Sequence, residues 1–222
     1  MYNLTLIIPA KEEKYSLPRV LDEVKDLNFK KLVVLAEDDF ETREAVKNSD
    51  CEILFQTGKG YGNAIREGIK HATTKYIAIF YADGSTDPID LKPMINKIID
   101  DKNQIVFGSR YEKNSSSDDD TIITFIGNKT FSFIGKVFFS LPITDILYTF
   151  VLGRTGKVNN LNLQSKDFCF CVELPIKAHK NKLKLTSSPA NERRRIAGKK
   201  KVNAFKDGLK ILVSMFKFFI NK

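Results

Sequence analysis

An apolar run that ends in carboxylates is the part of the sequence with the clearest chemistry. Residues 76–81 are aliphatic or aromatic and uncharged, which is typical of a buried strand. Asp83 and Asp87 follow among turn-forming residues, so both carboxylates are expected where the strand ends. Ligands of open α/β folds bind at that edge, and carboxylate oxygens there suit Mg²⁺ or Mn²⁺ holding a diphosphate. The alternative is an acidic turn that only ends the strand.

Basic and glycine residues at the ends of other predicted elements could contact phosphate groups. Arg110 follows an apolar strand, and its guanidinium suits either two-pronged phosphate contacts or a surface ion pair. Arg195 and Lys201 lie in the basic run 193–201, whose central glycine indicates a flexible loop; the alternative is a solvated face. Gly60 opens a predicted helix and allows the backbone to approach a ligand there.

The strands and helices that would position these residues alternate along the first half of the chain. Apolar runs predict strands at residues 4–8, 32–35, 52–55, 76–81 and 105–107, and helical spacing predicts helices at 17–27, 42–47, 60–71 and 90–101. This alternation favours a mostly parallel α/β sheet flanked by helices. Beyond a polar loop at 114–120, the pattern predicts a Phe-rich helix at 122–139, a strand at 168–174 and an amphipathic helix at 204–219.

Composition bounds the size of the fold and the class of partner. The 222 residues suffice for one sizeable core, and three cysteines without metal-binding spacing fit a reducing cytosol. The apolar start reads as a strand rather than a signal peptide, and no stretch of about 18 apolar residues is free of charge. Residues 177–222 hold 14 Lys and Arg against two acids, whereas residues 1–176 hold 22 against 25. This asymmetry indicates an anionic partner, whether nucleic acid, membrane surface or phosphate ligand.

Seven short motifs follow one another over nearly the whole chain. They are LIIPAKEE at 6–13, KGYGNA at 59–64, YADGS at 81–85, GSRY at 108–111, TD at 144–145, EL at 173–174 and RIAGKKK at 195–201. In this order they resemble family 2 glycosyltransferases, most of all the dolichol-phosphate mannosyltransferase-like group. Residues 37–39 (EDD) match the family's Asp-Asp-x-Ser-x-Asp only weakly, and two further positions depart from the family pattern. Tyr81 stands where the family has the first Asp of its metal-binding Asp-x-Asp, and Lys200 stands where it has Ser.

The resemblance implies a fold, an activity and a cofactor. The fold is GT-A-like, which is Rossmann-like, in a single domain over residues 1–222. Residues 1–111 would bind the nucleotide sugar and 112–203 the acceptor, while 204–222 would form the C-terminal amphipathic helix. The implied activity is that of an inverting glycosyltransferase that uses a UDP- or GDP-sugar with Mg²⁺ or Mn²⁺.

Site residues are carried over from the matching motifs. The metal would bind Asp83, with Asp87 as a substitute ligand for the position of Tyr81. Catalytic residues would be Asp83, Asp145, Arg110 and Arg195. The nucleotide sugar would be held by Pro9, Ala10, Glu12, Asp38 or Asp39, Lys59, Gly60, Asp83, Arg110, Arg195 and Lys201. The acceptor would meet Asp145 and Glu173.

The chemistry of the acceptor determines whether a general base is needed. A sugar hydroxyl must lose a proton to a carboxylate or His, whereas a polyprenyl phosphate is already an anionic nucleophile. Because neither His falls in a motif while Arg and Lys are abundant, a lipid phosphate or another membrane-bound acceptor is favoured, with Asp145 as the fallback base. The helix at 204–219, with lysines beside Phe and Leu, suits a peripheral position on the cytoplasmic membrane face, unless its apolar face packs on the core.

Rival functions are weighed against the same residues. Transfer to a saccharide hydroxyl in surface-polysaccharide synthesis is the nearest alternative. A sugar-phosphate nucleotidyltransferase would need a Gly-rich, Arg-containing loop after the first strand, where this chain has Pro9 and residues 10–13 (AKEE). A nucleic-acid-binding module would interleave aromatic residues with its basic run, which this chain does not, so nucleic acid is not expected as a partner. Tyr81 also leaves open a degenerate homologue that binds nucleotide without turnover.

Overall fold

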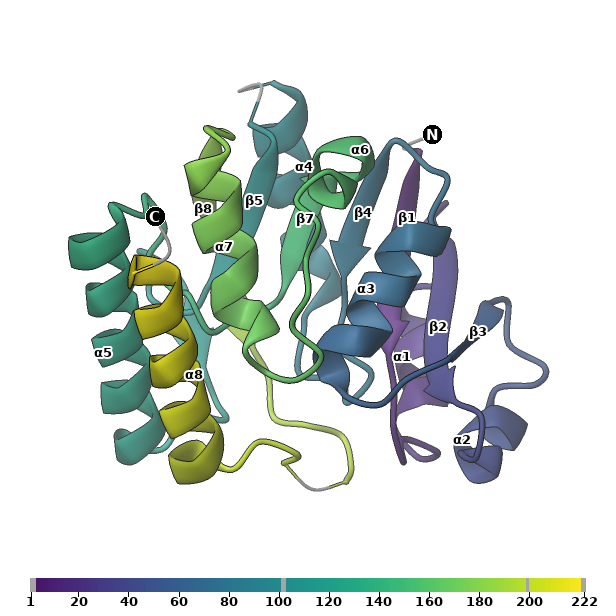
Figure 1. Cartoon of the computed structure of the whole chain (residues 1–222). Helices are drawn as coiled ribbons and strands as arrows, with labels where there is room; N and C mark the ends of the chain where they lie inside the picture. Colours follow the sequence, from purple (N-terminus) through teal and green to yellow (C-terminus); the bar gives the residue numbers. More distant parts are fainter. Residues whose placement is uncertain (1–2, 101–102, 199, 221–222) are drawn as a thin grey trace.

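A twisted sheet lies at the centre of the computed structural model, which describes residues 3–100, 103–198 and 200–220 (Figure 1). Its strands are β1 (Leu4–Pro9), β2 (Lys30–Ala36), β3 (Glu52–Gln56), β4 (Tyr76–Ile79), β5 (Ile105–Ser109), β7 (Val151–Arg154) and β8 (Leu185–Pro189). They pair in the order β3-β2-β1-β4-β7-β5-β8, and only β7 runs antiparallel to its neighbours. A small second ladder joins β6 (Ser116–Ser117) and β9 (Asn191–Glu192). The prediction of a mostly parallel α/β sheet is confirmed.

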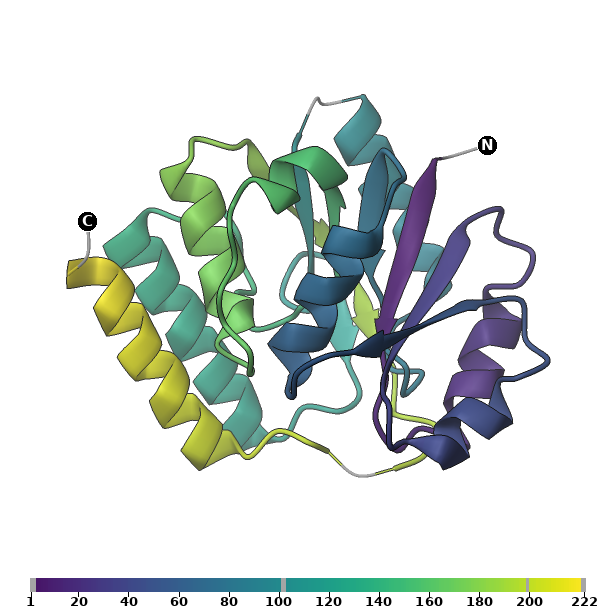
Figure 2. The same cartoon turned by 45° about the vertical axis from the view of Figure 1, so that its right-hand side comes forward.

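Helices cover both faces of this sheet (Figures 1 and 2). They are α1 (Leu17–Glu23), α2 (Phe40–Ala45), α3 (Tyr61–His71), α4 (Leu91–Ile99), α5 (Ile122–Phe139), α6 (Thr155–Asn159), α7 (Phe170–Lys180) and α8 (Ala204–Ile220). Alternation along β1 sends Ile7 into one core and its neighbours Leu6 and Ile8 into the other. The core of Ile7 includes residues of α3, α7 and α8, and the other core includes residues of α1 and α4.

The structure follows the predicted alternation closely in the first half of the chain and departs from it later. The predicted end of the fourth helix at 101 lies outside the described residues. The predicted strand at 168–174 is wrong, because Phe170–Lys180 form helix α7. All residues from Phe170 to Ile176, including Glu173, are buried, so the run is enclosed on every side and shows no exposed polar stripe with a helical period. The late strands are β7 and β8 instead.

Helices α5 and α8 lie side by side at one end of the sheet, as both views show (Figures 1 and 2). The predicted C-terminal helix is present, and Ile211 and Met215 pack it on the core. The predicted apolar face of α8 points away from the core, since Phe205 is 82% exposed and Phe216 is 63% exposed. Among the described residues, α5 is the one helix that is long and apolar enough to cross a membrane, by length and composition only.

Candidate active site

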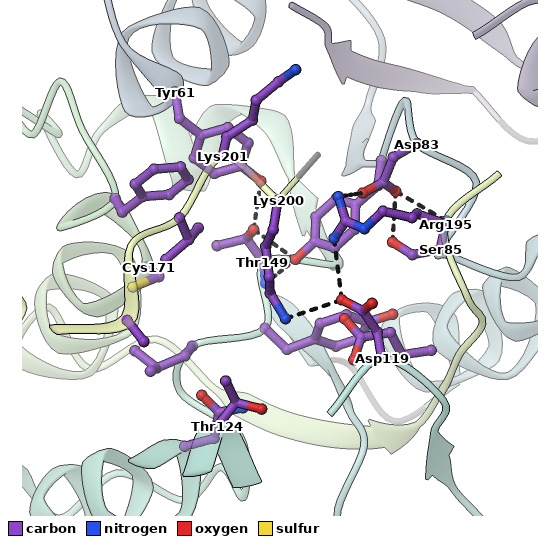
Figure 3. Close-up of a pocket in the computed structure, with 18 of the residues that line it drawn as sticks. Tyr61, Asp83, Ser85, Asp119, Thr124, Thr149, Cys171, Arg195, Lys200 and Lys201 are labelled. Atoms are coloured by element: carbon purple, nitrogen blue, oxygen red, sulfur yellow. Dashed lines mark hydrogen bonds and ion pairs between the residues drawn. The ribbon is translucent and has the colours of Figure 1, made fainter. Parts of the chain in front are cut away.

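A cavity of about 750 Å³ opens at the carboxyl ends of the central strands (Figure 3). Pro9 and Ala10 line it where β1 ends, and Asp83 lines it just after β4. Arg110 lines it directly after β5. The parallel strands therefore bring four of the predicted residues to one sheet edge, as the topology requires. Further parts of the wall come from α3, α5, α8, residues 147–149 and the basic residues Arg195, Lys200 and Lys201.

Asp83 is held by the turn that follows β4. One carboxylate oxygen, Oδ1, accepts hydrogen bonds from the Ser85 amide at 3.0 Å and the Ser85 hydroxyl at 2.7 Å. The other oxygen, Oδ2, lies 3.5 Å from Nη1 of Arg195. Gly84 has φ +81°, and a Cβ there would lie 2.4 Å from Cδ1 of Ile196, so the turn favours glycine. The turn thus presents one oxygen of Asp83 to a cationic group in the cavity.

Arg195 and Lys200 converge on a second carboxylate, that of Asp119 (Figure 3). Arg195 Nη2 lies 3.1 Å and Lys200 Nζ 3.0 Å from Oδ2 of Asp119. Burial would raise the pKa of Asp119, but hydrogen bonds from Lys200 and Arg195 outweigh it and lower that pKa below its usual value. Lys201 reaches Glu12 at 3.4 Å and Glu13 at 3.7 Å. The basic segment is therefore tied to the cavity wall by ion pairs that an anionic ligand can replace.

Glu13 and Asp119 line the cavity but were absent from the predicted site. Glu13 is buried and accepts a hydrogen bond from the Ser16 hydroxyl at 2.6 Å. Burial raises the pKa of Glu13, against the lowering effects of Ser16 and Lys201. The sequence did offer a signal for Asp119, because a run of three aspartates at 118–120 can pair with the later basic run. For Glu13 the signal is the Glu-Glu pair at 12–13, of which the predicted site includes only Glu12.

Glu12 lies outside the cavity lining, next to the predicted ribose-contacting acids. Its side chain is 68% exposed and its backbone has a left-handed φ of 54°. Its amide donates to Oδ2 of Asp39 at 2.7 Å, and Asp39 also accepts from the Thr42 amide as the N-cap of α2. Asp38 is exposed on the same turn and does not line the cavity. The structure thus groups these acids at the cavity rim rather than in its wall.

The hydroxyl groups of three lining residues, Tyr61, Tyr81 and Thr149, form an uncharged part of the cavity wall. The Tyr81 phenol oxygen accepts from the Thr149 amide at 2.8 Å and lies 2.9 Å from the Thr149 hydroxyl. The Tyr61 hydroxyl is 2.6 Å from the same Thr149 hydroxyl. Burial raises the pKa of Tyr81 well above its usual value, so the phenol stays protonated. Tyr81 therefore puts a neutral group, already engaged with Thr149, where the resembled family has a carboxylate.

Arg110 and Asp145 form a buried pair with two parallel hydrogen bonds. Arg110 Nε lies 2.7 Å from Oδ2 of Asp145, and Nη2 lies 3.1 Å from Oδ1. Glu192 adds a third contact at 3.2 Å. Burial opposes the charge on Arg110, but Asp145 and Glu192 keep its pKa well above the usual value. Asp145 is fully buried with both oxygens on Arg110 and does not line the cavity, so it acts on the site through Arg110.

Three other predicted residues, Asp87, Lys59 and Gly60, have no demonstrated contact role in the cavity. Asp87 accepts from the Ile89 amide at 3.0 Å and caps a short 3₁₀ turn, without lining the cavity. Lys59 is exposed and also lies outside the lining. Gly60 lines the cavity with φ +107°, but a Cβ there would lie 2.2 Å from the Lys166 carbonyl oxygen, so its close approach is to the chain itself.

Glu173, predicted to meet the acceptor, lies in α7 with its carboxylate turned inward. It accepts from the amides of Gln164 and Ser165 at 2.7 Å each, and Lys177 lies 2.8 Å away. Burial would raise its pKa, but Lys177 and the two amides lower it. Glu173 is 1% exposed and does not line the cavity. In this geometry its carboxylate fixes the loop that precedes α7.

Asp83 is the predicted metal ligand, and of the two predicted ligands, Asp83 and Asp87, it is the one that lines the cavity. Within the described residues, no group of three or more His, Cys, Asp and Glu side chains is arranged to hold a metal. Mg²⁺ and Mn²⁺ are commonly bound through one or two carboxylates together with substrate phosphates, not by an all-protein cage. Oδ2 of Asp83, beside Arg195 and open to the cavity, fits that mode.

Comparison with known proteins identifies the family of this chain. A family model described as "Glycosyl transferase family 2" matches residues 5–161, which include β1 to β7 and the Asp83 turn. The chain belongs to glycosyl transferase family 2. The matched segment contains the strand ends that line the cavity.

Relatives within glycosyl transferase family 2 match different lengths of the chain. A protein named "Uncharacterized glycosyltransferase" from Mycobacterium tuberculosis is 30% identical over 95 residues, which is 43% of each chain. The UDP-N-acetylglucosamine–dolichyl-phosphate N-acetylglucosaminyltransferase of Methanococcus voltae is 26% identical over 209 residues, which is 83% of each chain. The match to the mycobacterial relative thus spans less than half of that protein's length.

Solved structures share the GT-A fold over almost the whole chain. Glucosyl-3-phosphoglycerate synthase from Mycobacterium tuberculosis, in complex with phosphoglyceric acid, superposes with a TM-score of 0.77. The match covers 98% of this chain and 80% of the synthase at 11% sequence identity. The same synthase in complex with Mn²⁺, UDP and its product gives a TM-score of 0.74. At this identity the likeness establishes the fold of this family 2 member and not its substrates.

Proposed function

We propose that the protein transfers a sugar, with inversion, from a UDP- or GDP-sugar to a polyprenyl phosphate or another membrane-associated acceptor. The observation that carries the proposal is the division of the cavity. Asp83, Arg195, Lys200 and Lys201 lie toward the strand ends, and apolar residues of α5 and α8 form another wall. This arrangement fits two phosphate-bearing ligands, one of which also has an apolar part.

The donor side of the cavity suits a nucleoside diphosphate. Arg195 and Lys201 are paired with carboxylates that a diphosphate can replace, because a diphosphate offers several anionic oxygens to a guanidinium and to an ammonium group alike. Asp83 and the diphosphate would together hold a divalent cation. That cation would neutralise the negative charge of the leaving group. In support, the structurally similar glucosyl-3-phosphoglycerate synthase was crystallised with Mn²⁺ and UDP.

The reaction needs no general base if the acceptor is a lipid phosphate. An acceptor phosphate oxygen attacks the anomeric carbon, the bond from that carbon to the diphosphate oxygen breaks, and the nucleoside diphosphate leaves with the electron pair. Asp145, the predicted base, already gives both oxygens to Arg110. The name of the Methanococcus voltae relative, which gives dolichyl phosphate as acceptor, supports this class.

A saccharide hydroxyl is the second candidate acceptor, and Glu13 is the observation that favours it. Its carboxylate lines the cavity, and burial raises its pKa toward the range in which a carboxylate accepts a proton efficiently. A hydroxyl acceptor would make turnover depend on Glu13, whereas a phosphate acceptor would not. Glu13→Gln therefore separates the two candidates.

A panel of UDP- and GDP-sugars tests the proposal directly. The purified protein with Mn²⁺ is expected to release nucleoside diphosphate from at least one donor, and faster when a polyprenyl phosphate in detergent is added. The measurement is released nucleotide with and without acceptor. Stimulation by oligosaccharides alone would favour the saccharide candidate. Nucleotide binding without release from any donor would identify a degenerate homologue.

The exposed face of α5 and α8 supports a peripheral position on an anionic membrane, at its cytoplasmic face. Lys206, Lys210 and Lys217 flank the exposed apolar residues of α8. Each lysine near an anionic leaflet contributes about 1 kcal/mol, so replacing all three with glutamine should weaken vesicle binding roughly a hundredfold at low salt. Turnover in detergent should stay unchanged. Co-sedimentation with phosphatidylserine-containing vesicles across a salt series measures the effect.

A matched charge change on other surfaces is the control for the α8 lysines. Lys30, Lys70 and Lys92 are exposed residues of β2, α3 and α4, and their triple glutamine variant removes the same charge. It should bind vesicles nearly as well as the wild type. Equal loss in both triple variants would show that only net charge matters. Unchanged binding of the α8 variant would mean that the protein reaches its acceptor by another route.

A further inference from the structure

The basic run 193–201 is hydrogen-bonded through its backbone to the turn that carries Asp83. The Arg193 amide donates to the Ser85 carbonyl at 2.8 Å. The Ile196 amide donates to the Asp83 carbonyl, also at 2.8 Å. Backbone hydrogen bonds of this kind hold a segment in place whatever its side chains do. The start of the basic run is therefore attached to the residue that is the predicted metal ligand.

The side chain of Ile196 fills the space above Gly84 in the same turn. A Cβ on Gly84 would lie 2.4 Å from Cδ1 and 2.6 Å from Cγ1 of Ile196, so the isoleucine occupies the room that a side chain at position 84 would need. Ile196 is also partly buried against the core that includes residues of α1 and α4. Because these contacts remove apolar surface from water, they favour the position in which the basic run is docked on the turn.

Ile196 directly follows Arg195 in the chain but does not itself line the cavity. Arg195 does line it, with Nη1 3.5 Å from Asp83 and Nη2 3.1 Å from Asp119 (Figure 3). An arginine side chain has many rotamers, and ordering it when a ligand binds reduces the affinity for that ligand. A backbone that is already fixed beside Arg195 limits the positions that its guanidinium can reach. Ile196 can therefore influence a ligand that it does not touch.

We propose that Ile196 is a positioning residue, which docks on Gly84 and so holds the backbone of Arg195 beside the Asp83 turn before a diphosphate binds. The proposal rests on the donor side of the proposed function, because it takes the phosphate groups of the donor as the ligand of Arg195. It adds that the Asp83 turn and the start of the basic run form one unit. The residue that joins them touches neither the donor nor the cation.

Titration calorimetry with UDP and Mn²⁺ tests the effect on the ligand. Ile196→Ala removes the contact with Gly84 and keeps the backbone amide, and it should weaken UDP binding about tenfold, the loss of roughly one charge-assisted hydrogen bond to phosphate. Ile196→Val, which keeps a branched side chain, should restore most of the affinity. The double variant Arg195→Ala/Ile196→Ala should bind UDP no more weakly than Arg195→Ala alone, because Ile196 acts through Arg195. Independent losses from the two substitutions would overturn the proposal.

Limited digestion with trypsin tests the docking in the ligand-free protein. Cleavage after residues 193–195 requires this part of the chain to leave the turn, so its rate reports how often the docked position opens. In Ile196→Ala this rate should rise about tenfold over the wild type, once each rate is divided by that of a peptide of the same sequence. Mass spectrometry of the fragments that begin at residues 194–196 measures it. An unchanged rate would show that Ile196 does not hold the run on the turn.

Ile53→Ala is the matched control, because Ile53 is a partly buried isoleucine packed against the same core but lies in β3 and does not line the cavity. It should lower the melting temperature and leave both UDP affinity and cleavage after residues 193–195 unchanged. If Ile196→Ala changed the melting temperature alone, its role would be structural and the proposal would be overturned. Faster cleavage in Ile196→Ala, in a protein whose wild type does not bind UDP, would uphold the docking and refute the proposed donor.

Discussion

Replacing Asp83 with alanine is expected to abolish glycosyl transfer and leave the fold intact. Asp83 offers Oδ2 to the cavity and, within the described residues, no cluster of three metal-ligating side chains could take its place. Losing the protein ligand of the cation removes charge stabilisation of the leaving diphosphate, so kcat should fall by about a thousandfold or more. Arg195 keeps Asp119 as a partner, so the melting temperature should change little. Steady-state kinetics with Mn²⁺ and calorimetric unfolding measure the two effects.

Two variants of the same turn complete the test. Tyr81→Asp restores the carboxylate that the family has at that position and should keep or tighten Mn²⁺ binding, measured by titration calorimetry. Asp87→Ala should only remove the cap of the 3₁₀ turn, at a cost of about 1 kcal/mol in unfolding free energy. A loss of Mn²⁺ binding in Asp87→Ala would restore its predicted role as a ligand. Full activity of Asp83→Ala, or activity unaffected by a chelator, would refute the metal role.

Replacing Arg195 with alanine is expected to lower kcat by about a hundredfold, even with soluble donor in detergent. Arg195 lies between Asp83 and Asp119, where its charge faces a bound diphosphate or an acceptor phosphate. Because the contact strengthens as charge develops on the leaving group, kcat and kcat/KM should fall together. Steady-state kinetics at saturating acceptor measure both constants.

The adjacent arginine provides the control for Arg195. Arg194 is exposed, so Arg194→Ala removes the same charge from the same segment and should leave kcat unchanged. Arg193→Ala should instead lower the melting temperature, because Arg193 binds Glu23 and the Thr86 carbonyl. If Arg194→Ala and Arg195→Ala reduced kcat equally, the basic segment would act through its net charge rather than through a defined contact.

The first half of the fold was predictable because each element there has a clear period and a turn at its end. The helix α7 was not, because its apolar residues face core on all sides and leave no polar stripe. The strand β7 was missed because it has only four residues, one of them glycine, and pairs with β4 and β5 from a distant part of the chain.

The candidate site was predictable where residues follow strands and unpredictable where loops meet. Asp83 and Arg110 directly follow strands of one sheet, so topology alone places them at the cavity. Asp119 and Arg195 are 76 residues apart and meet through a loop contact that no local pattern encodes. The sequence does not determine which face of α8 is exposed. An amphipathic pattern shows that the two faces of a helix differ, but it does not show which of them contacts the rest of the domain.

The position of β7 has a consequence for how the protein is made. In the finished sheet β5 pairs with β7 on one side and β8 on the other, so neither of its neighbours has been synthesised when residue 111 leaves the ribosome. Residues 1–111 of the nascent chain can assemble β1 to β4. The two edges of β5 stay unpaired until β7 and β8, respectively, have been made. Exposed strand edges of this kind attract other chains, and non-local pairing is slow. Synthesis of residues 112–189 is therefore the interval in which β5 lacks at least one of its two partner strands.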